Sequence, residues 1–256
     1  MKCLLRPLLR IYLKTLVKLA IFIHRPVVVA VAGSMNKHIA KEAIVKELLY
    51  CKIDARAGRR GFNTDIGLPL TVLNLPSGFN SYKDWRRTVI IAPRVIFKKM
   101  ERVLVLEFGI SEVGDSQYLL SIVKPQIIVI TEITARYIEN FKNTDQIIRE
   151  YECLVTNINE DGLVVANIDN LNIRKLVLSV KAPLITFGFN VKADNVIDSV
   201  GVRTTGQSVI IKTSDKSQCL NVDRFGKHHA YAAVISQIVL KYFLSNDKSV
   251  QKKTKV

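Results

Sequence analysis

Five continuous apolar runs, rich in the β-branched residues Val and Ile, give the sequence its clearest pattern. Runs of this length, bounded by polar or glycine-containing turns, are typical of strands buried on both faces of a parallel sheet. We therefore predict strands at residues 27–32, 102–108, 126–131, 162–167 and 182–188.

Segments with helical spacing lie between these runs. In Ile39–Tyr50, Ile44 and Leu48 fall on one face of a helix, whereas Lys41 and Lys46 fall on the other. Alternating strands and helices predict an α/β fold with a doubly wound, mostly parallel sheet of the P-loop type, flanked by helices. Further helices are predicted at residues 3–23, 68–75, 84–99, 116–123, 135–155, 172–180 and 228–244.

The pattern changes towards the C-terminus. Residues 199–222 contain short alternating segments, which predict a small antiparallel extension at one edge of the sheet. The polar, basic stretch 245–256 has the composition of a disordered tail. The chain is therefore predicted to consist of a basic helix at 1–25, a domain at 26–244 and this tail.

A glycine turn directly follows the first predicted strand. Gly33, Ser34 and Lys37 stand between Val27–Ala32 and a helix, which is the layout of a phosphate-binding loop. In such a loop, backbone N–H groups and the helix N-terminus hold an anion while the lysine reaches the outer phosphates. The alternative interpretation is an ordinary turn between a strand and a helix.

Two residues depart from the usual Gly-Lys-Ser/Thr sequence of such a loop. Asn36 replaces the glycine, and asparagine tolerates a positive φ well enough to make the same turn. His38 replaces the hydroxyl residue that normally binds Mg²⁺, and imidazole is a poor ligand for that hard cation.

A carboxylate, Glu107, lies near the end of the second predicted strand, Arg102–Phe108. Ligands of open α/β sheets bind beyond the carboxyl ends of the strands, so Glu107 is placed where a Mg²⁺ ligand would be useful. The alternative is a carboxylate at the edge of the core that caps a neighbouring helix.

The chain carries a formal net charge of +16, and this charge is unevenly distributed. Residues 1–60 hold 13 Lys and Arg against 3 Asp and Glu. Such a region favours anionic partners, namely polyphosphate, lipid headgroups or nucleic acid. Nucleic acid is disfavoured because aromatic residues are not interleaved with the basic ones and no zinc-finger, RNA-recognition or helix-turn-helix signature is found.

The four cysteines are scattered and form no Cys-x-x-Cys pair. They are interpreted as reduced thiols of a cytoplasmic protein rather than as a disulfide framework or a zinc site.

Residues 3–23 are apolar but are interrupted by Arg6, Arg10, Lys14 and Lys18. Four charges disfavour a transmembrane helix. A secretory signal is disfavoured too, because its cleavage would destroy the first strand. Two interpretations remain: an amphipathic helix on an anionic membrane surface, or a helix packed on the domain with a solvated basic face.

Seven segments, taken in their order along the chain, together resemble one family. They are VAVAGSMNKHIAKE, GFNTDIGLPLTVL, VLEFGISEVGD, KPQIIVITEI, VVANIDN, TFGFNVKAD and GKHHAYAAV. The series is similar to the central ATP-binding domain of the Mur ligases over about residues 26–244, and most of all to the members that add D-alanyl-D-alanine.

This resemblance implies an ATP-dependent amide ligase of peptidoglycan precursor synthesis, with ATP and Mg²⁺ as cofactors. Such enzymes phosphorylate a carboxylate, and an amine then displaces the phosphate. The implied nucleotide-binding residues are Gly33, Ser34, Asn36, Lys37, His38 and His228; Asn63 and Asp65 lie on the substrate side, and Glu107 binds the metal.

The chain also departs from the family. The positions of a metal-binding histidine and of a carbamylated lysine are occupied by Tyr137 and Tyr151, and a phenol is a weak Mg²⁺ ligand. A short basic helix and a short tail also stand where the family has its UDP-binding and C-terminal domains.

Three functions are compatible with these observations. The chain is a ligase domain that is impaired on its own and relies on a separate chain for the missing C-terminal domain. Alternatively, it is an inactive nucleotide-binding partner subunit, or a scaffold on a membrane surface that keeps only the fold.

Overall fold

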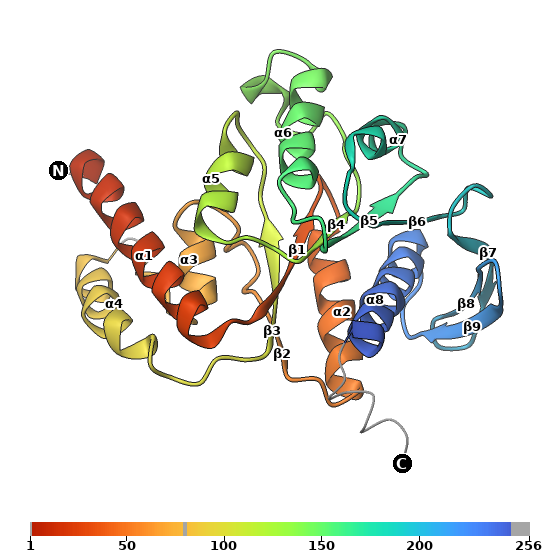
Figure 1. The fold of residues 1–256 in the computed structure, drawn as a ribbon, viewed down its shortest axis with the longest axis horizontal. Coiled ribbons are helices and arrows are strands. Elements are labelled where there is room, and N and C mark those ends of the chain that lie inside the picture. The colour runs from red at the N-terminus through yellow and green to blue at the C-terminus, as the bar shows by residue number, and fades with distance from the viewer. Residues whose placement is uncertain (1, 79–80, 247–256) are drawn as a thin grey trace.

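The computed structural model describes residues 2–78 and 81–246, and within them the strands form one sheet of nine. The strand order is β2-β3-β1-β4-β5-β6-β7-β8-β9, with parallel pairing from β2 to β7 and antiparallel pairing from β7 to β9 (Figure 1). The strands are β1 (Val27–Ala32), β2 (Ala55–Ala57), β3 (Val103–Phe108), β4 (Ile127–Ile130), β5 (Leu163–Asn167), β6 (Leu184–Gly188), β7 (Asn195–Val202), β8 (Gln207–Lys212) and β9 (Ser217–Val222).

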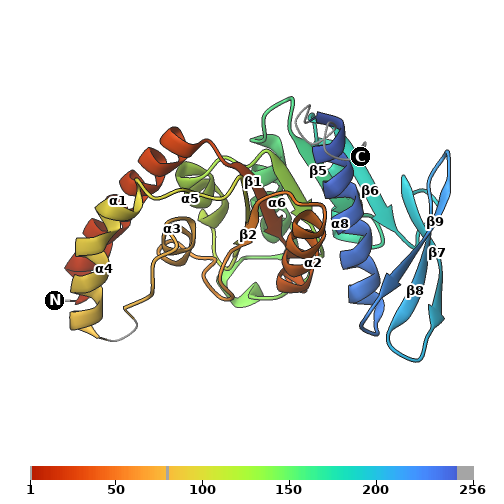
Figure 2. The ribbon, with the colours of Figure 1, turned by 90° about the horizontal axis from the view of Figure 1, so that it is seen from below.

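Helices cover both faces of the sheet, as Figure 2 shows. On one face α2 and α8 pack against each other, and the other helices cover the opposite face. The helices are α1 (Lys2–His24), α2 (Lys37–Tyr50), α3 (Gly67–Val72), α4 (Tyr82–Val95), α5 (Asp115–Ile122), α6 (Thr144–Thr156), α7 (Leu171–Leu176) and α8 (Lys227–Asn246), with 3₁₀ turns η1 (Ile138–Asn140) and η2 (Val177–Ser179).

Strand β1 contributes to two hydrophobic clusters at once. Val28 and Ala30 belong to the cluster under α1 and α3–α6, whereas Val29 and Val31 belong to the cluster under α2 and α8. This alternation follows from the two-residue period of a strand and explains why the run is apolar at every position. The predicted fold class, including the antiparallel extension, is confirmed.

The helix predicted at 135–155 is wrong in its first part, because α6 begins only at Thr144. Tyr137 has a left-handed backbone, with φ at 63°, and a 3₁₀ turn follows it. Helix α6 begins only after Asn143, whose side chain accepts a hydrogen bond from the Gln146 N–H at 2.9 Å. An asparagine in this position satisfies a backbone donor of the first helical turn and fixes where the helix begins.

Helix α1 packs on the domain through Leu13, Val17 and Ala20, each fully buried. One of the two interpretations of this segment, a helix packed on the domain, therefore describes its inner side. Within the described part of the chain, no helix is long and apolar enough to cross a membrane. The predicted disordered tail lies outside the described residues, apart from its first two positions, which continue α8.

Candidate nucleotide-binding site

The candidate site lies at the carboxyl ends of the parallel strands, where the strand order reverses around β1. Such a reversal leaves a crevice between loops that run in opposite directions, and ligands of open α/β sheets bind there. The loop Gly33–Asn36 leaves β1 at this point, Glu107 is near the end of β3, and Thr131 follows β4.

The loop after β1 adopts the backbone that the sequence predicts. Asn36 is left-handed, with φ at 61° and ψ at 9°, and immediately precedes α2. Gly33 has φ at 142°, and a Cβ atom there would collide with Thr131 Oγ1. The Thr131 hydroxyl donates to the Met35 carbonyl oxygen at 2.8 Å, so the loop is fastened to the end of β4.

Lys37 is turned back onto this loop. Its Nζ donates to the Gly33 carbonyl oxygen at 2.5 Å. Burial lowers the pKa of Lys37, the attraction of Glu107 opposes this shift, and repulsion from Arg136 adds to it. A partly desolvated ammonium next to a second cation favours an incoming anion, because the anion relieves both the burial cost and the repulsion.

The hydroxyl of Ser34 makes its hydrogen bond within the protein. Its Oγ accepts a hydrogen bond from the Thr134 N–H at 2.9 Å, and Arg136 Nη1 donates to the Ser34 carbonyl oxygen at 3.0 Å. The phenol of Tyr151 lies beside Ser34, and burial raises the pKa of Tyr151 to about 12. The phenol of Tyr151, which was predicted to stand in the position of a carbamylated lysine, is therefore neutral at physiological pH.

Glu107 is paired with a lysine that was predicted to lie on the solvated face of its helix. Lys41 is buried, and its Nζ lies 2.6 Å from Glu107 Oε1 and 2.5 Å from the Gly58 carbonyl oxygen. The prediction that Lys41 belongs to the solvated face of its helix is wrong, because Glu107 compensates its charge inside the protein. A signal was present: Lys41 lies one turn before Ile44 and Val45, on the buried stripe of α2.

These residues do not fit a Mg²⁺ ion held by the protein. The Glu107 carboxylate, which would bind the ion, is paired with the Lys41 ammonium instead. His38 offers a nitrogen atom in place of a hydroxyl oxygen. In residues 2–78 and 81–246, no group of three or more His, Cys, Asp or Glu side chains could hold a metal. A metal role for Glu107 stays a prediction, and it requires Lys41 to move away.

The start of α8 faces the same loop. His228 lines a small pocket together with Asn36, Thr131 and Asn167, so the structure brings together two residues predicted on the nucleotide side. The rings of His228 and His229 are 4.4 Å apart. Burial lowers the pKa of His229, and its basic neighbours His228, Arg224 and His38 add to this shift. Three imidazoles, those of His38, His228 and His229, therefore lie near one another.

Asp169, which was not among the predicted site residues, holds this side of the site together. The Asp169 carboxylate accepts hydrogen bonds from the backbone N–H groups of Phe189 and Asn190, both at 2.8 Å, and from the Tyr231 hydroxyl at 2.5 Å. It thereby ties the ends of β5 and β6 to α8. Burial, together with this carboxylate, raises the pKa of Tyr231.

The two predicted substrate-side residues lie apart from the loop after β1. The Asn63 carbonyl oxygen accepts from the Gly109 N–H at 2.9 Å, which places Asn63 beside the loop that follows β3. Asp65 instead pairs with Arg6 and Arg10 of α1, at 3.0 and 3.3 Å. The N-terminal helix therefore reaches the segment that was predicted to line the substrate side.

Residues 33–240 match the model of the Mur ligase middle domain. The chain belongs to the Mur ligase family. This match begins at the loop after β1, covers strands β2 to β9 and ends at Leu240 within α8, so it includes the loop, Glu107 and His228. The family resemblance stated from the sequence is thereby confirmed.

Named relatives agree with this assignment. A UDP-N-acetylmuramoyl-tripeptide–D-alanyl-D-alanine ligase from Borreliella burgdorferi is 29% identical over 119 residues, which are 46% of this chain and 21% of that protein. The ligase of the same name from Bacillus subtilis is 22% identical over 216 residues, or 84% of this chain and 41% of that protein.

A solved structure shares the fold. MurF ligase from Thermotoga maritima in complex with ADP superposes with a TM-score of 0.70 at 21% identity, over 91% of this chain and 49% of that one. This Mur ligase middle domain therefore spans less than half the length of the relatives named here.

Proposed function

We propose that this Mur ligase middle domain binds ATP at the loop between β1 and α2 and serves as the phosphoryl-transfer part of an amide ligase. Gly33, Lys37 and the N-terminus of α2 hold the phosphates, and His228 lies beside the base. The observation that carries the proposal is the left-handed Asn36, which directs the start of α2 and Lys37 to the edge where the strand order reverses.

In the proposed reaction, a substrate carboxylate oxygen attacks the γ-phosphorus of ATP, and ADP leaves. An amine then attacks the carbonyl carbon of the acyl phosphate, loses a proton and expels phosphate. Within this chain, Lys37 stabilises the charge on the transferred group, while Lys41 holds Glu107 in place.

The rest of the ligase site is proposed to come from a separate chain. The chain spans 49% or less of the relatives compared above, so a complete ligase uses surfaces beyond those aligned here. Asn63 and the loop after β3 are the parts of this domain proposed to face the bound substrate.

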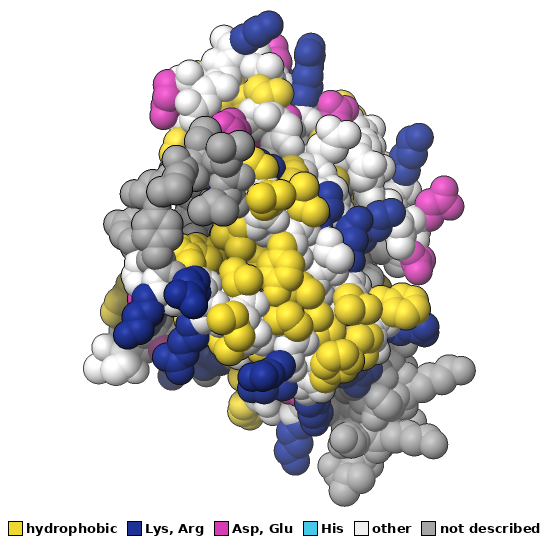
Figure 3. Space-filling model, turned by 90° about the vertical axis from the view of Figure 1, so that its left-hand side faces the viewer, with side chains coloured by type: hydrophobic (Ala, Val, Ile, Leu, Met, Phe, Trp, Pro, Cys, Tyr) yellow, Lys and Arg dark blue, Asp and Glu magenta, His cyan; other side chains and the backbone are white. Residues whose placement is uncertain are grey.

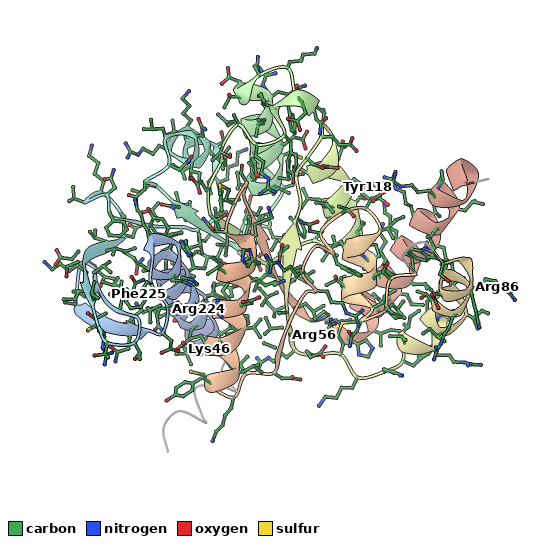
Figure 4. All side chains as sticks on the ribbon, turned by 180° about the vertical axis from the view of Figure 1, so that it is seen from behind. Lys46, Arg56, Arg86, Tyr118, Arg224 and Phe225 are labelled. Atoms are coloured by element: carbon green, nitrogen blue, oxygen red, sulfur yellow. The ribbon has the colours of Figure 1, made fainter. Side chains whose placement is uncertain are left out.

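Titration calorimetry with ATP tests the nucleotide site, in Mg²⁺ and in a chelator, on the wild type and on Lys37→Met. The variant keeps the aliphatic stem but loses a charge-assisted contact, which is worth roughly 10- to 100-fold in affinity. Lys46→Ala is the matched control, because Lys46 lies on the same helix with an exposed side chain. Figure 4 labels Lys46 and Arg224, which lie far from α4 in that view.

Binding that weakens in Lys37→Met but not in Lys46→Ala supports the proposal. No binding to the wild type, or equal binding by both variants, refutes it. Release of phosphate from ATP when a candidate partner chain and an amino-acid acceptor are added would then test the ligase step.

A further inference from the structure

The outer side of α1 is unusually apolar for a surface helix. Leu8 and Ile11 are each 65% exposed, and Phe22 is 71% exposed. These positions follow a helical spacing on the side opposite to Leu13 and Val17, which are buried in the core. Helix α1 is therefore apolar on two opposite sides, and only one of them is covered by the domain.

Helix α4 lies next to α1 and widens this surface. The Tyr12 hydroxyl donates to the Val89 carbonyl oxygen at 2.8 Å, and His24 Nε2 lies 2.7 Å from the Ile96 carbonyl oxygen, so the two helices run side by side in the same direction. We define the α1–α4 face by its exposed apolar side chains: Leu8, Ile11, Leu19, Phe22, Ile23, Ile90 and Phe97.

Figure 3 shows apolar side chains gathered on this side of the molecule, with Lys and Arg side chains around them and few acidic ones. Exposed patches of this kind on a protein surface mark sites of interaction. Arg86 is an exposed residue of α4, and in Figure 4 it points away from the domain.

The sequence makes this end of the molecule strongly positive. Residues 1–25 contribute six Lys and Arg and no acidic residue, and residues 82–99 contribute six Lys and Arg against one aspartate. These two segments carry +11 of the formal net charge of +16. Exposed basic side chains on or next to α1 and α4 include Lys18, Arg25, Arg86, Arg87, Arg94 and Lys98.

We propose that the α1–α4 face binds an anionic lipid bilayer, with α1 and α4 lying flat on the surface. Apolar side chains enter the boundary between headgroups and acyl chains, while long Lys and Arg side chains reach the phosphates around them. Charge complementarity selects this occupant. A second copy of the chain would bring two strongly positive faces together, which is unfavourable.

Deleting α1 is not a clean test, because Leu13, Val17 and Ala20 fill the core. Point substitutions on the exposed side avoid this problem. One variant carries Phe22→Ser and Phe97→Ser. A second replaces Lys18, Arg86, Arg87 and Lys98 with glutamine. The matched control carries Val202→Ser and Lys192→Gln, which are exposed positions at the opposite end of the sheet.

Co-sedimentation with vesicles measures the partition coefficient of the full chain. The vesicles are either phosphatidylcholine alone or two parts phosphatidylcholine to one part phosphatidylglycerol. Each basic residue near an anionic surface is worth about fivefold in partitioning, so the four-glutamine variant is expected to lose roughly 100- to 1000-fold. The two-serine variant is expected to lose at least about tenfold.

Salt-sensitive binding to the anionic vesicles alone, lost in both face variants and kept by the control, supports the proposal. Absence of binding by the wild type at low salt overturns it, and so does an equal loss in the control. A dimer that forms without lipid and is broken by the two serine substitutions also overturns it, since the occupant would then be a second copy. Unchanged thermal melting and ATP titration of each variant establish that the fold is intact.

Discussion

Replacing Lys41 with methionine tests whether the buried pair with Glu107 holds the site together. Lys41 is 2% exposed and the Glu107 side chain 7%, and the two charged atoms lie 2.6 Å apart. Removing one partner of such a pair leaves an uncompensated buried charge, which costs about 3–5 kcal/mol of unfolding free energy. For a chain of this size, that loss corresponds to a drop of roughly 6–20 °C in melting temperature.

The assay is a double-mutant cycle measured by urea unfolding, with Lys41→Met, Glu107→Gln and the double variant. The double variant carries neither charge. Its loss of unfolding free energy should therefore be smaller than the sum of the two single losses by about 2 kcal/mol or more. The control is the same cycle on the exposed pair Lys212–Asp198, whose charged atoms lie 2.8 Å apart. Its interaction free energy should be at most about 1 kcal/mol.

Additive single effects, within about 0.5 kcal/mol, would refute this reasoning, because they would mean that the two charges do not depend on each other.

A second readout uses ligand binding. Lys41→Met releases the Glu107 carboxylate, so its ATP affinity should depend more on Mg²⁺ than that of the wild type. An unchanged Mg²⁺ dependence would show that Lys41 does not take the place of a cation there.

Three further predictions concern other parts of the molecule. Gly33→Ala should lower the free energy of unfolding in urea by about 1–3 kcal/mol and abolish ATP binding, because the new Cβ collides with Thr131. Its control is Gly61→Ala, which has open space around the new Cβ and should keep ATP binding. Because the pKa of Tyr151 is about 12 in the fold and about 10 in the unfolded chain, stability should fall as the pH rises from about 10 to 12, and fall less in Tyr151→Phe. Asp65→Asn should lower stability by less than about 1 kcal/mol yet speed hydrogen exchange in the first turns of α1, since it removes the partner of Arg6 and Arg10.

The buried strands were predictable because each contains a continuous run of apolar residues. Strand β1 agrees with its predicted bounds, and β3 differs from its own by one residue. Strand β2 was missed, because three residues with a central arginine carry no strand pattern. Arg56 is held there by tertiary contacts, donating to Glu101 and to the carbonyl oxygens of Thr71 and Val72.

The site was partly predictable for the same kind of reason. The turn at Gly33 and Asn36 follows from local backbone preferences, which a sequence records directly. The pairing of Lys41 with Glu107 joins residues 66 positions apart. The place of Lys41 on the buried stripe of α2 indicates that it is buried but does not identify its partner. Asp169 was not assigned for a similar reason, since its partners at Phe189 and Tyr231 come from later elements.

The contact between α2 and α8 has a consequence for how this domain is made on the ribosome. The apolar side of α2, with Ile44 and Leu48, is covered by side chains of α8 such as Val234 and Ile238. About 190 residues separate the starts of the two helices, so α8 leaves the ribosome roughly 10–40 s after α2. During that interval this apolar side of α2 stays uncovered, and the nascent chain is a natural client for chaperones that shield apolar surface.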